Sequence, residues 1–70
     1  MPAGPEPAEP KYRLTQLTTY ELRDYRRQLE TAIAFFDRQA PAPRARDRLQ
    51  AKLDDVIAEQ DDRARLATHA

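Results

Sequence analysis

Few residues in this sequence belong to types that carry out chemistry. The only histidine, His69, is second from the end of the 70 residues, and the sequence has no Cys and no Ser. A Ser or Cys nucleophile needs a neighbouring base to activate it, and a phosphate-binding loop needs several glycines. Gly4 is the only glycine. We therefore predict that the chain is not an enzyme and has no catalytic residues.

Paired carboxylates are the next chemical feature of the sequence. Asp54 and Asp55 are adjacent, as are Asp61 and Asp62, and adjacent residues on a helix point in different directions. The sequence has no E-x-x-H pair of the kind that binds metals in helical bundles, and the absence of Cys excludes a thiolate metal site. These carboxylates are predicted to face solvent, and no metal or cofactor is expected.

A polar series on the second half of the chain is the remaining candidate site. Arg46, Gln50 and Asp54 recur at every fourth residue, which places them along one flank of a helix. The favoured interpretation is a hydrogen-bonded flank that supports the helix. The alternative is a ligand-binding stripe, in which the planar fork of Arg46 bonds a phosphate or a guanine edge.

The spacing R-x-x-x-Q-x-x-x-D of these three residues resembles part of the motif of the actinobacterial anti-sigma factors that respond to cyclic di-GMP. In that family a Glu and a Ser precede the Arg, and here Gln39 and Pro43 stand at those positions. The resemblance implies an antiparallel helical hairpin that grips a sigma factor, with Arg46 and Asp54 contacting guanine and phosphate groups. Because the leading half of the motif is absent, the resemblance favours a helical-hairpin regulator over a nucleotide receptor.

The N-terminal half of the chain is predicted to be a tail followed by a helix. Four prolines lie within residues 1–10 and exclude helix and central strand there, so residues 1–17 are expected to be a disordered tail and a short bridge. Thr18 and Glu21 have the spacing of a capping box, and Leu17 and Leu22 that of a hydrophobic staple. These signals predict a helix over about 19–39. Its apolar stripe consists of Leu22, Tyr25, Leu29, Ala32, Ile33 and Phe36.

The C-terminal half is predicted to form a second helix over about 44–66, with residues 67–70 frayed. The short break between the helices favours an antiparallel hairpin. Cations dominate residues 44–52, and acids dominate residues 54–62. Antiparallel packing places the acidic residues 54–62 beside the early cations of the first helix, and it places the basic residues 44–52 beside Glu30 and Asp37. The early cations are Arg23, Arg26 and Arg27, and the second apolar stripe is Ala45, Leu49, Leu53, Val56, Ile57 and Ala64.

The two stripes predict assembly beyond one hairpin. A two-helix layer covers each stripe on one side only, and a scaffold of this size without a disulfide or metal has little stability to spare. We expect an all-α hairpin that forms a four-helix bundle or a coiled-coil-like homodimer, or that binds a helical partner protein. Tyr20 and Phe35 lie off the stripe. The favoured interpretation is that they are single exposed apolar residues, which are common on protein surfaces, and the alternative is that they mark a second contact surface. The expected packing and interface residues are Leu22, Tyr25, Leu29, Ile33, Phe36, Leu49, Leu53, Val56 and Ile57.

Composition narrows the function classes. Twelve basic and twelve acidic residues give zero formal net charge, which disfavours nucleic-acid binding. No apolar run approaches the roughly 18 residues of a membrane span and residues 1–10 lack the core of a signal peptide, so a cytoplasmic location is expected. Abundant Arg and Ala are typical of a GC-rich bacterial genome.

We therefore predict a small non-catalytic helical interaction or regulatory protein that acts by protein–protein binding. One alternative is a transcription-linked regulator that binds a sigma factor or a cyclic dinucleotide. A second alternative is a nucleic-acid-binding accessory protein, for which the contact patch would be formed by the cations of the second helix together with Arg23, Arg26 and Arg27.

Overall fold

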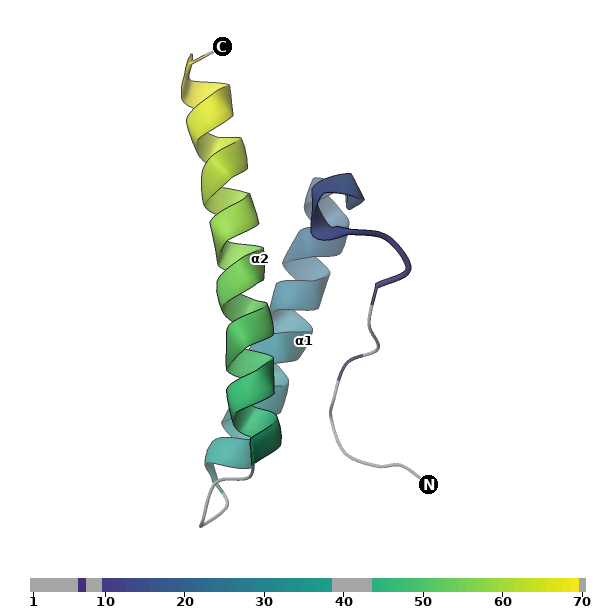
Figure 1. Ribbon diagram of the computed structural model, residues 1–70, viewed down its shortest axis with the longest axis vertical. Coiled ribbons are helices and arrows are strands. Elements are labelled where there is room, and N and C mark those ends of the chain that lie inside the picture. Colours follow the sequence, from purple (N-terminus) through teal and green to yellow (C-terminus); the bar gives the residue numbers. More distant parts are fainter. Residues whose placement is uncertain (1–6, 8–9, 39–43, 70) are drawn as a thin grey trace.

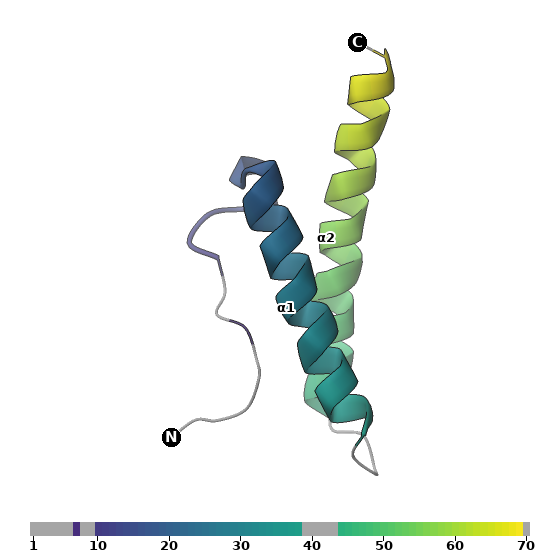
Figure 2. The ribbon, with the colours of Figure 1, turned by 180° about the vertical axis from the view of Figure 1, so that it is seen from behind.

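The computed structural model describes residue 7, residues 10–38 and residues 44–69. These residues form a 3-10 helix η1 (Leu14–Gln16) and two α-helices, α1 (Thr19–Asp37) and α2 (Arg44–His69). The two α-helices pack side by side and antiparallel, and no strand occurs among the described residues (Figure 1). They lie close together at the hairpin tip, where α1 ends and α2 begins, and spread apart toward the opposite, open end (Figure 2). The prediction of an all-α antiparallel hairpin is confirmed.

The start of α1 agrees with the sequence signals. The Thr18 hydroxyl accepts a hydrogen bond from the Glu21 amide at 3.1 Å, and the Glu21 carboxylate accepts one from the Thr18 amide at 2.8 Å. Leu17 and Leu22 are both buried, as a hydrophobic staple requires. The helix ends at Asp37, two residues before the predicted end. Gln39 and the predicted break at residues 40–43 lie outside the described residues.

The second helix is longer than predicted, because α2 continues past Leu66 to His69. The sequence has no Gly or Pro after Pro43 to stop it. In the last turns the Thr68 hydroxyl donates to the Ala64 carbonyl at 2.8 Å, and Arg65 pairs with Asp62. The structure thus includes residues 67–69, which were predicted to fray, in α2, and Ala70 lies outside the described residues. The end of α2 extends beyond the start of α1 (Figure 1).

Both apolar stripes meet in one core within a single chain. Leu29 and Val56 have no exposed surface, and Leu22 is 1% exposed. The expectation that a hairpin leaves its stripes half covered is therefore wrong for these side chains. Ala64, assigned to the second stripe, is exposed instead, because it lies near the open end, where α1 and α2 have separated. The buried residues are Leu17, Leu22, Tyr25, Leu29, Ala32, Ile33, Leu49, Leu53 and Val56, with Leu14, Phe36 and Ile57 packed against them.

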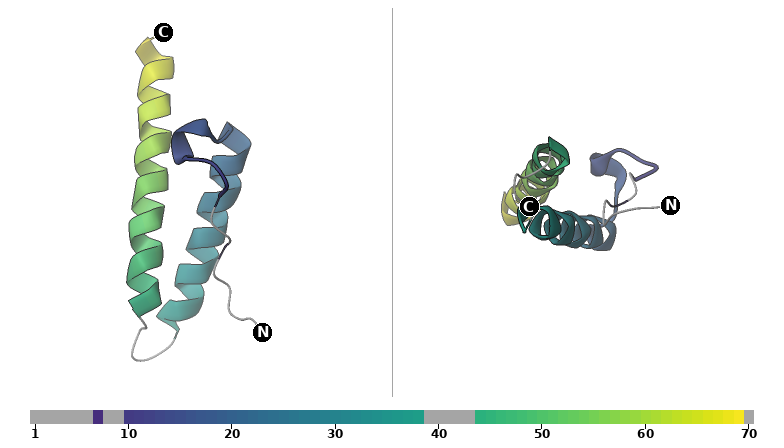
Figure 3. Two further views of the ribbon diagram at one scale, coloured as in Figure 1. Left: turned by 45° about the vertical axis from the view of Figure 1, so that its right-hand side comes forward. Right: turned by 90° about the horizontal axis from the view of Figure 1, so that it is seen from below.

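The cover for the open end comes from residues 10–17, called here the N-terminal arm. Leu14 packs against the core and Leu17 belongs to it. The Arg63 guanidinium of α2 donates to the Leu14 carbonyl at 3.0 Å and to the Thr15 carbonyl at 3.4 Å. The arm thus forms a third element beside α1 and α2 (Figure 3). The sequence predicted a bridge over residues 11–17 in which Leu17 packs as part of the hydrophobic staple, and it left open whether the rest of the bridge lies along the helices.

Candidate protein-binding surface

The polar series Arg46, Gln50 and Asp54 lies along one flank of α2, as predicted. The Arg46 guanidinium reaches across to α1 and bonds both carboxylate oxygens of Asp37, with Nε–Oδ1 at 2.7 Å and Nη2–Oδ2 at 3.4 Å. The Gln50 amide donates to Asp54 Oδ1 at 3.0 Å along α2. The hydrogen bond from Arg46 lowers the pKa of the Asp37 carboxyl, and Asp37 in turn raises the pKa of Arg46. The geometry is that of a flank whose members bond within the fold.

The predicted charge match between the helices occurs at the tip but not at the open end. At the tip, Asp37 pairs with Arg46 as expected. At the open end, Arg26 bonds Glu30 of its own helix at 3.2 Å and the uncharged Gln60 of α2 at 2.7 Å. Arg23 lies over the Tyr20 ring at 5.7 Å. Across the described residues, no ion pair joins α1 cations to the acids of residues 54–62, because the helices diverge there.

Tyr20 and Phe35 are both exposed, at 74% and 43%, but they do not form one surface. They are 15 positions apart on α1, about 22 Å along the helix axis. The Phe35 and Phe36 rings pack edge to face, with centroids 5.4 Å apart and planes at 81°. Phe36 contacts the core while Phe35 remains accessible at the tip. The predicted second contact surface therefore divides into two separate positions.

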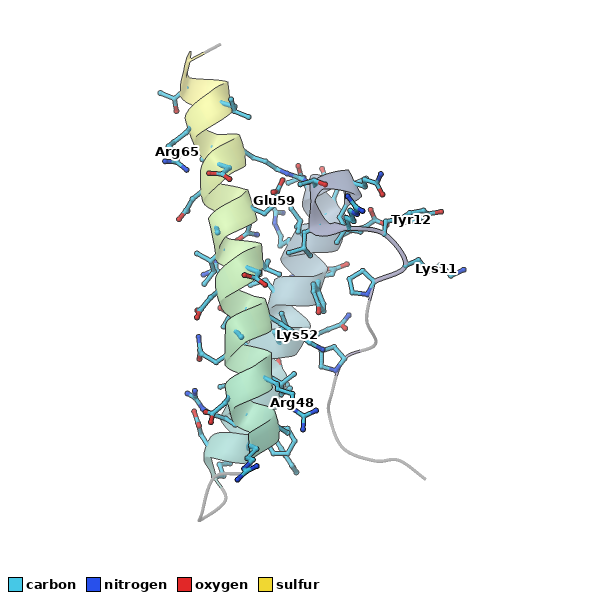
Figure 4. The ribbon with its side chains drawn as sticks, viewed as in Figure 1. Lys11, Tyr12, Arg48, Lys52, Glu59 and Arg65 are labelled. Atoms are coloured by element: carbon cyan, nitrogen blue, oxygen red, sulfur yellow. The ribbon has the colours of Figure 1, made fainter. Side chains whose placement is uncertain are left out.

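A concave surface that was not predicted surrounds Tyr12 of the N-terminal arm. A hollow of about 330 Å³ lies between the arm and α1, and one of about 220 Å³ extends from the arm to α2. Both are lined by Pro10, Tyr12 and Tyr25, and we call them the Tyr12 hollows. Tyr12 is 63% exposed, and Figure 4 shows Lys11 and Tyr12 projecting from the arm and Lys52 from α2. The further lining residues are Lys11, Leu17, Glu21, Asp24 and Gln28 in the larger hollow, and Arg13, Leu14, Lys52 and Asp55 in the smaller.

The lining of the Tyr12 hollows suits contact with another protein chain. Tyrosine, proline and leucine side chains supply apolar surface, and charged residues of both signs surround them. Interfaces are enriched in aromatic residues and have polar rims. The sequence signal that pointed here was the apolar series Tyr12, Leu14 and Leu17, which is too short to define an element without the fold.

The adjacent carboxylate pairs do not converge on a common point. Asp54 accepts from Gln50 and Asp62 pairs with Arg65, while Asp55 and Asp61 are exposed. Within residues 7, 10–38 and 44–69, no group of three or more His, Cys, Asp or Glu residues is arranged to hold a metal ion. In the same residues, no helix has the length and apolar character to cross a membrane.

No family model, no curated protein and no solved structure matches the chain.

Proposed function

We propose that this chain is a small helical interaction module, which acts by binding another protein and not by catalysis. The observation that carries the proposal is the exposed Tyr12 ring standing between two hollows that have apolar and charged walls. A tyrosine presents a large contact area with few rotatable bonds and a polar tip that tolerates water. An exposed ring beside concave apolar surface is therefore well suited to a protein contact.

The size of the hollows indicates what they accept. Sites for whole small-molecule ligands measure about 300–1,000 Å³, and the two hollows, at about 330 and 220 Å³, are at or below the lower end of that range. Hollows of this size suit individual side chains of a partner protein. The mixed charges at their edges, including Lys11, Asp24 and Asp55, favour a partner segment that also carries both signs.

The proposal is tested by retrieving partners from an extract of the cells that make this protein. A tagged wild-type chain is compared with Tyr12→Ala and with Tyr20→Ala, the matched control, since Tyr20 is also exposed but lies outside the hollows. We expect a partner retained by the wild type and by Tyr20→Ala. Tyr12→Ala should weaken its binding about tenfold or more, as for an interface hot spot. Equal retention by both variants, or no retained protein, would contradict the proposal.

A transcription-linked regulator is the second candidate function. It is favoured by the Arg46, Gln50 and Asp54 series on the second helix of an antiparallel hairpin, the part of the anti-sigma factor motif that this chain resembles. In the structure Asp37 occupies the Arg46 fork, so a nucleotide would have to displace Asp37. Calorimetry with cyclic di-GMP is therefore expected to show no binding. Saturable binding that Asp37→Asn strengthens and Arg46→Ala abolishes would make this candidate the first.

Self-association is part of the proposal, but its physical reason differs from the one the stripes suggested. The core side chains are buried within one chain, so a four-helix bundle that shares these stripes would have to open the hairpin. A dimer that keeps the fold must use an exposed face. Its interface must therefore be sought among the residues on the outside of the hairpin.

A further inference from the structure

The charges of α2 are segregated along its length. Residues 44–52 carry four cations and one acid, a net charge of +3, while residues 54–62 carry five acids and no cation, a net charge of −5. Leu53 separates the two blocks. Little of this pattern contributes to ion pairs between the two helices. Arg46 of the basic block forms such an ion pair with an acid of α1, namely Asp37 at 2.7 Å. The acidic block receives no α1 cation in the described part of the chain.

One exposed face of α2 displays the segregated charges in a single row. Six residues spaced alternately by four and three positions form this row, and such spacing keeps residues on one side of a helix. All six are exposed. In Figure 1 neither α1 nor the N-terminal arm passes in front of α2, and Asp55 lies at the edge of this face, where it also lines the smaller Tyr12 hollow. We call this row the outer stripe, and it consists of Arg44, Arg48, Ala51, Asp55, Ala58 and Asp62.

We propose that the outer stripe binds the outer stripe of a second copy of this chain, with the two α2 helices antiparallel. The inference rests on the self-association proposed above and specifies its face and orientation. In a symmetric dimer the same patch contacts itself, so the patch must be complementary to its own reversed copy. The outer stripe has this property, because its basic half and its acidic half lie on opposite sides of Leu53.

The pairing follows from a two-fold axis that crosses α2 level with Leu53. Arg44 then lies opposite Asp62 of the second copy, and Arg48 lies between Asp55 and Asp62 of the second copy. Symmetry repeats both contacts. Ala51 and Ala58 present only methyl groups, so the helix axes can approach to the short end of the usual 8–10 Å range. Parallel pairing would place like charges together, which charged interfaces avoid.

The contact is expected to be weak and sensitive to salt. It spans residues 44–62, about 27 Å of helix, and its charges remain at the surface, where ion pairs contribute little and are screened. The dimer should therefore form at tens of micromolar chain or above, in low salt, and dissociate as salt is added.

Charge reversal in sedimentation experiments tests the inference with the full chain. One variant carries Arg44→Glu with Arg48→Glu, and the other carries Asp55→Lys with Asp62→Lys. The control carries Arg27→Glu with Arg38→Glu, which changes the net charge as the first variant does but at exposed residues outside the outer stripe. Circular dichroism verifies that each variant keeps its helices.

We expect the wild type and the control to dimerise, and each outer-stripe variant alone to associate at least about tenfold more weakly, because like charges then face each other. An equimolar mixture of the two outer-stripe variants should form a heterodimer, since each reversed half meets its complement. If both outer-stripe variants dimerise as strongly as the wild type, the chain self-associates through another face and the outer stripe is not the interface. A wild type that remains monomeric at every concentration would overturn self-association itself.

Discussion

At the residue scale, position on the helix and not residue type decides what each leucine does. Leu29 and Leu66 have the same side chain, but Leu29 has no exposed surface and Leu66 is 71% exposed. Leu29 lies on the apolar stripe of α1, against α2. Leu66 lies on the part of α2 that extends past the start of α1, where no helix covers it. The same chemical group therefore contributes to stability in one place and remains on the surface in the other.

Truncating these two leucines should have very different effects. Leu29→Ala removes buried methyl groups and leaves a cavity, so it should lower the free energy of unfolding by about 2–5 kcal/mol. Leu66→Ala, the matched control, should change it by less than about 0.5 kcal/mol. Urea denaturation followed by circular dichroism measures both. Similar losses for the two variants would show that Leu66 is covered in solution.

The ion pair between Asp37 and Arg46 should give stability a specific pH dependence. Arg46 lowers the pKa of Asp37 in the folded state below its ordinary value of about 3.9. The stabilisation is therefore fully present above the ordinary pKa and is lost as the pH falls through the lowered, folded-state value. Asp37 is exposed and Arg46 is partly exposed, so the effect should be small and reduced by salt.

Thermal unfolding between about pH 5 and pH 2 measures this contribution. The wild type should lose more stability on acidification than Asp37→Asn, which has no carboxylate at that position to protonate. Asp61→Asn serves as the control and should follow the wild type, because the Asp61 side chain makes no hydrogen bond or ion pair within the described residues. Identical pH profiles for the wild type and Asp37→Asn would show that the pair does not form in solution.

At the scale of elements, the N-terminal arm connects α1 and α2 at the open end of the hairpin. The capping box and the staple fix where α1 begins through contacts among residues 17–22. The arm instead crosses to α2, where Arg63 binds the carbonyls of Leu14 and Thr15. The two hydrogen bonds join residues that are far apart in the sequence, by 49 positions for Leu14 and by 48 positions for Thr15. The arm closes the core at the open end, where α1 and α2 diverge.

Two truncations separate the proline-rich segment from the arm. Deleting residues 1–10 should leave the helical signal and the thermal midpoint nearly unchanged, as the sequence predicts. Deleting residues 1–17 also removes the buried Leu17 and the packing of Leu14. This deletion should lower the free energy of unfolding by about 2 kcal/mol or more. Circular dichroism melts of both proteins compare them. An equal loss for the two deletions would show that residues 1–10 pack on the helices as well.

At the scale of the whole molecule, one copy of the chain closes its own core. The nine buried apolar residues contact each other within the hairpin and arm, and no buried side-chain polar atom lacks a hydrogen-bond partner in the described residues. The weak outer-stripe dimer would add contacts on the outside of this fold. Folding is therefore expected not to require self-association.

This separation predicts that the thermal midpoint is independent of protein concentration in the low micromolar range. A weakly bound second copy contributes to stability only when its concentration exceeds the dissociation constant. Circular dichroism melts over a tenfold dilution series provide the measurement. A midpoint that rises steeply with concentration would instead support a four-helix bundle whose core is shared between copies.

The sequence alone determined the helices and their relative direction. The pair Thr18 and Glu21 and the prolines before residue 44 act through neighbours in the chain, and the apolar period of each helix acts through residues three and four positions away. Such local interactions are visible in a sequence, and they predicted the all-α hairpin, the start of α1 and most of the buried residues of α1 and α2. The spacing of Arg46, Gln50 and Asp54 likewise indicated a flank of α2, though not the bond to Asp37.

Only the tertiary structure decided which surfaces are covered and which remain free. The divergence of α1 and α2 leaves Ala64 exposed and separates the α1 cations from the acidic block, and no local pattern specifies the angle between two helices. The Tyr12 hollows arise because the arm folds back onto both helices, a contact between residues far apart in the chain. Long-range packing of this kind depends on the shape of the assembled core, which exists only after the helices have met.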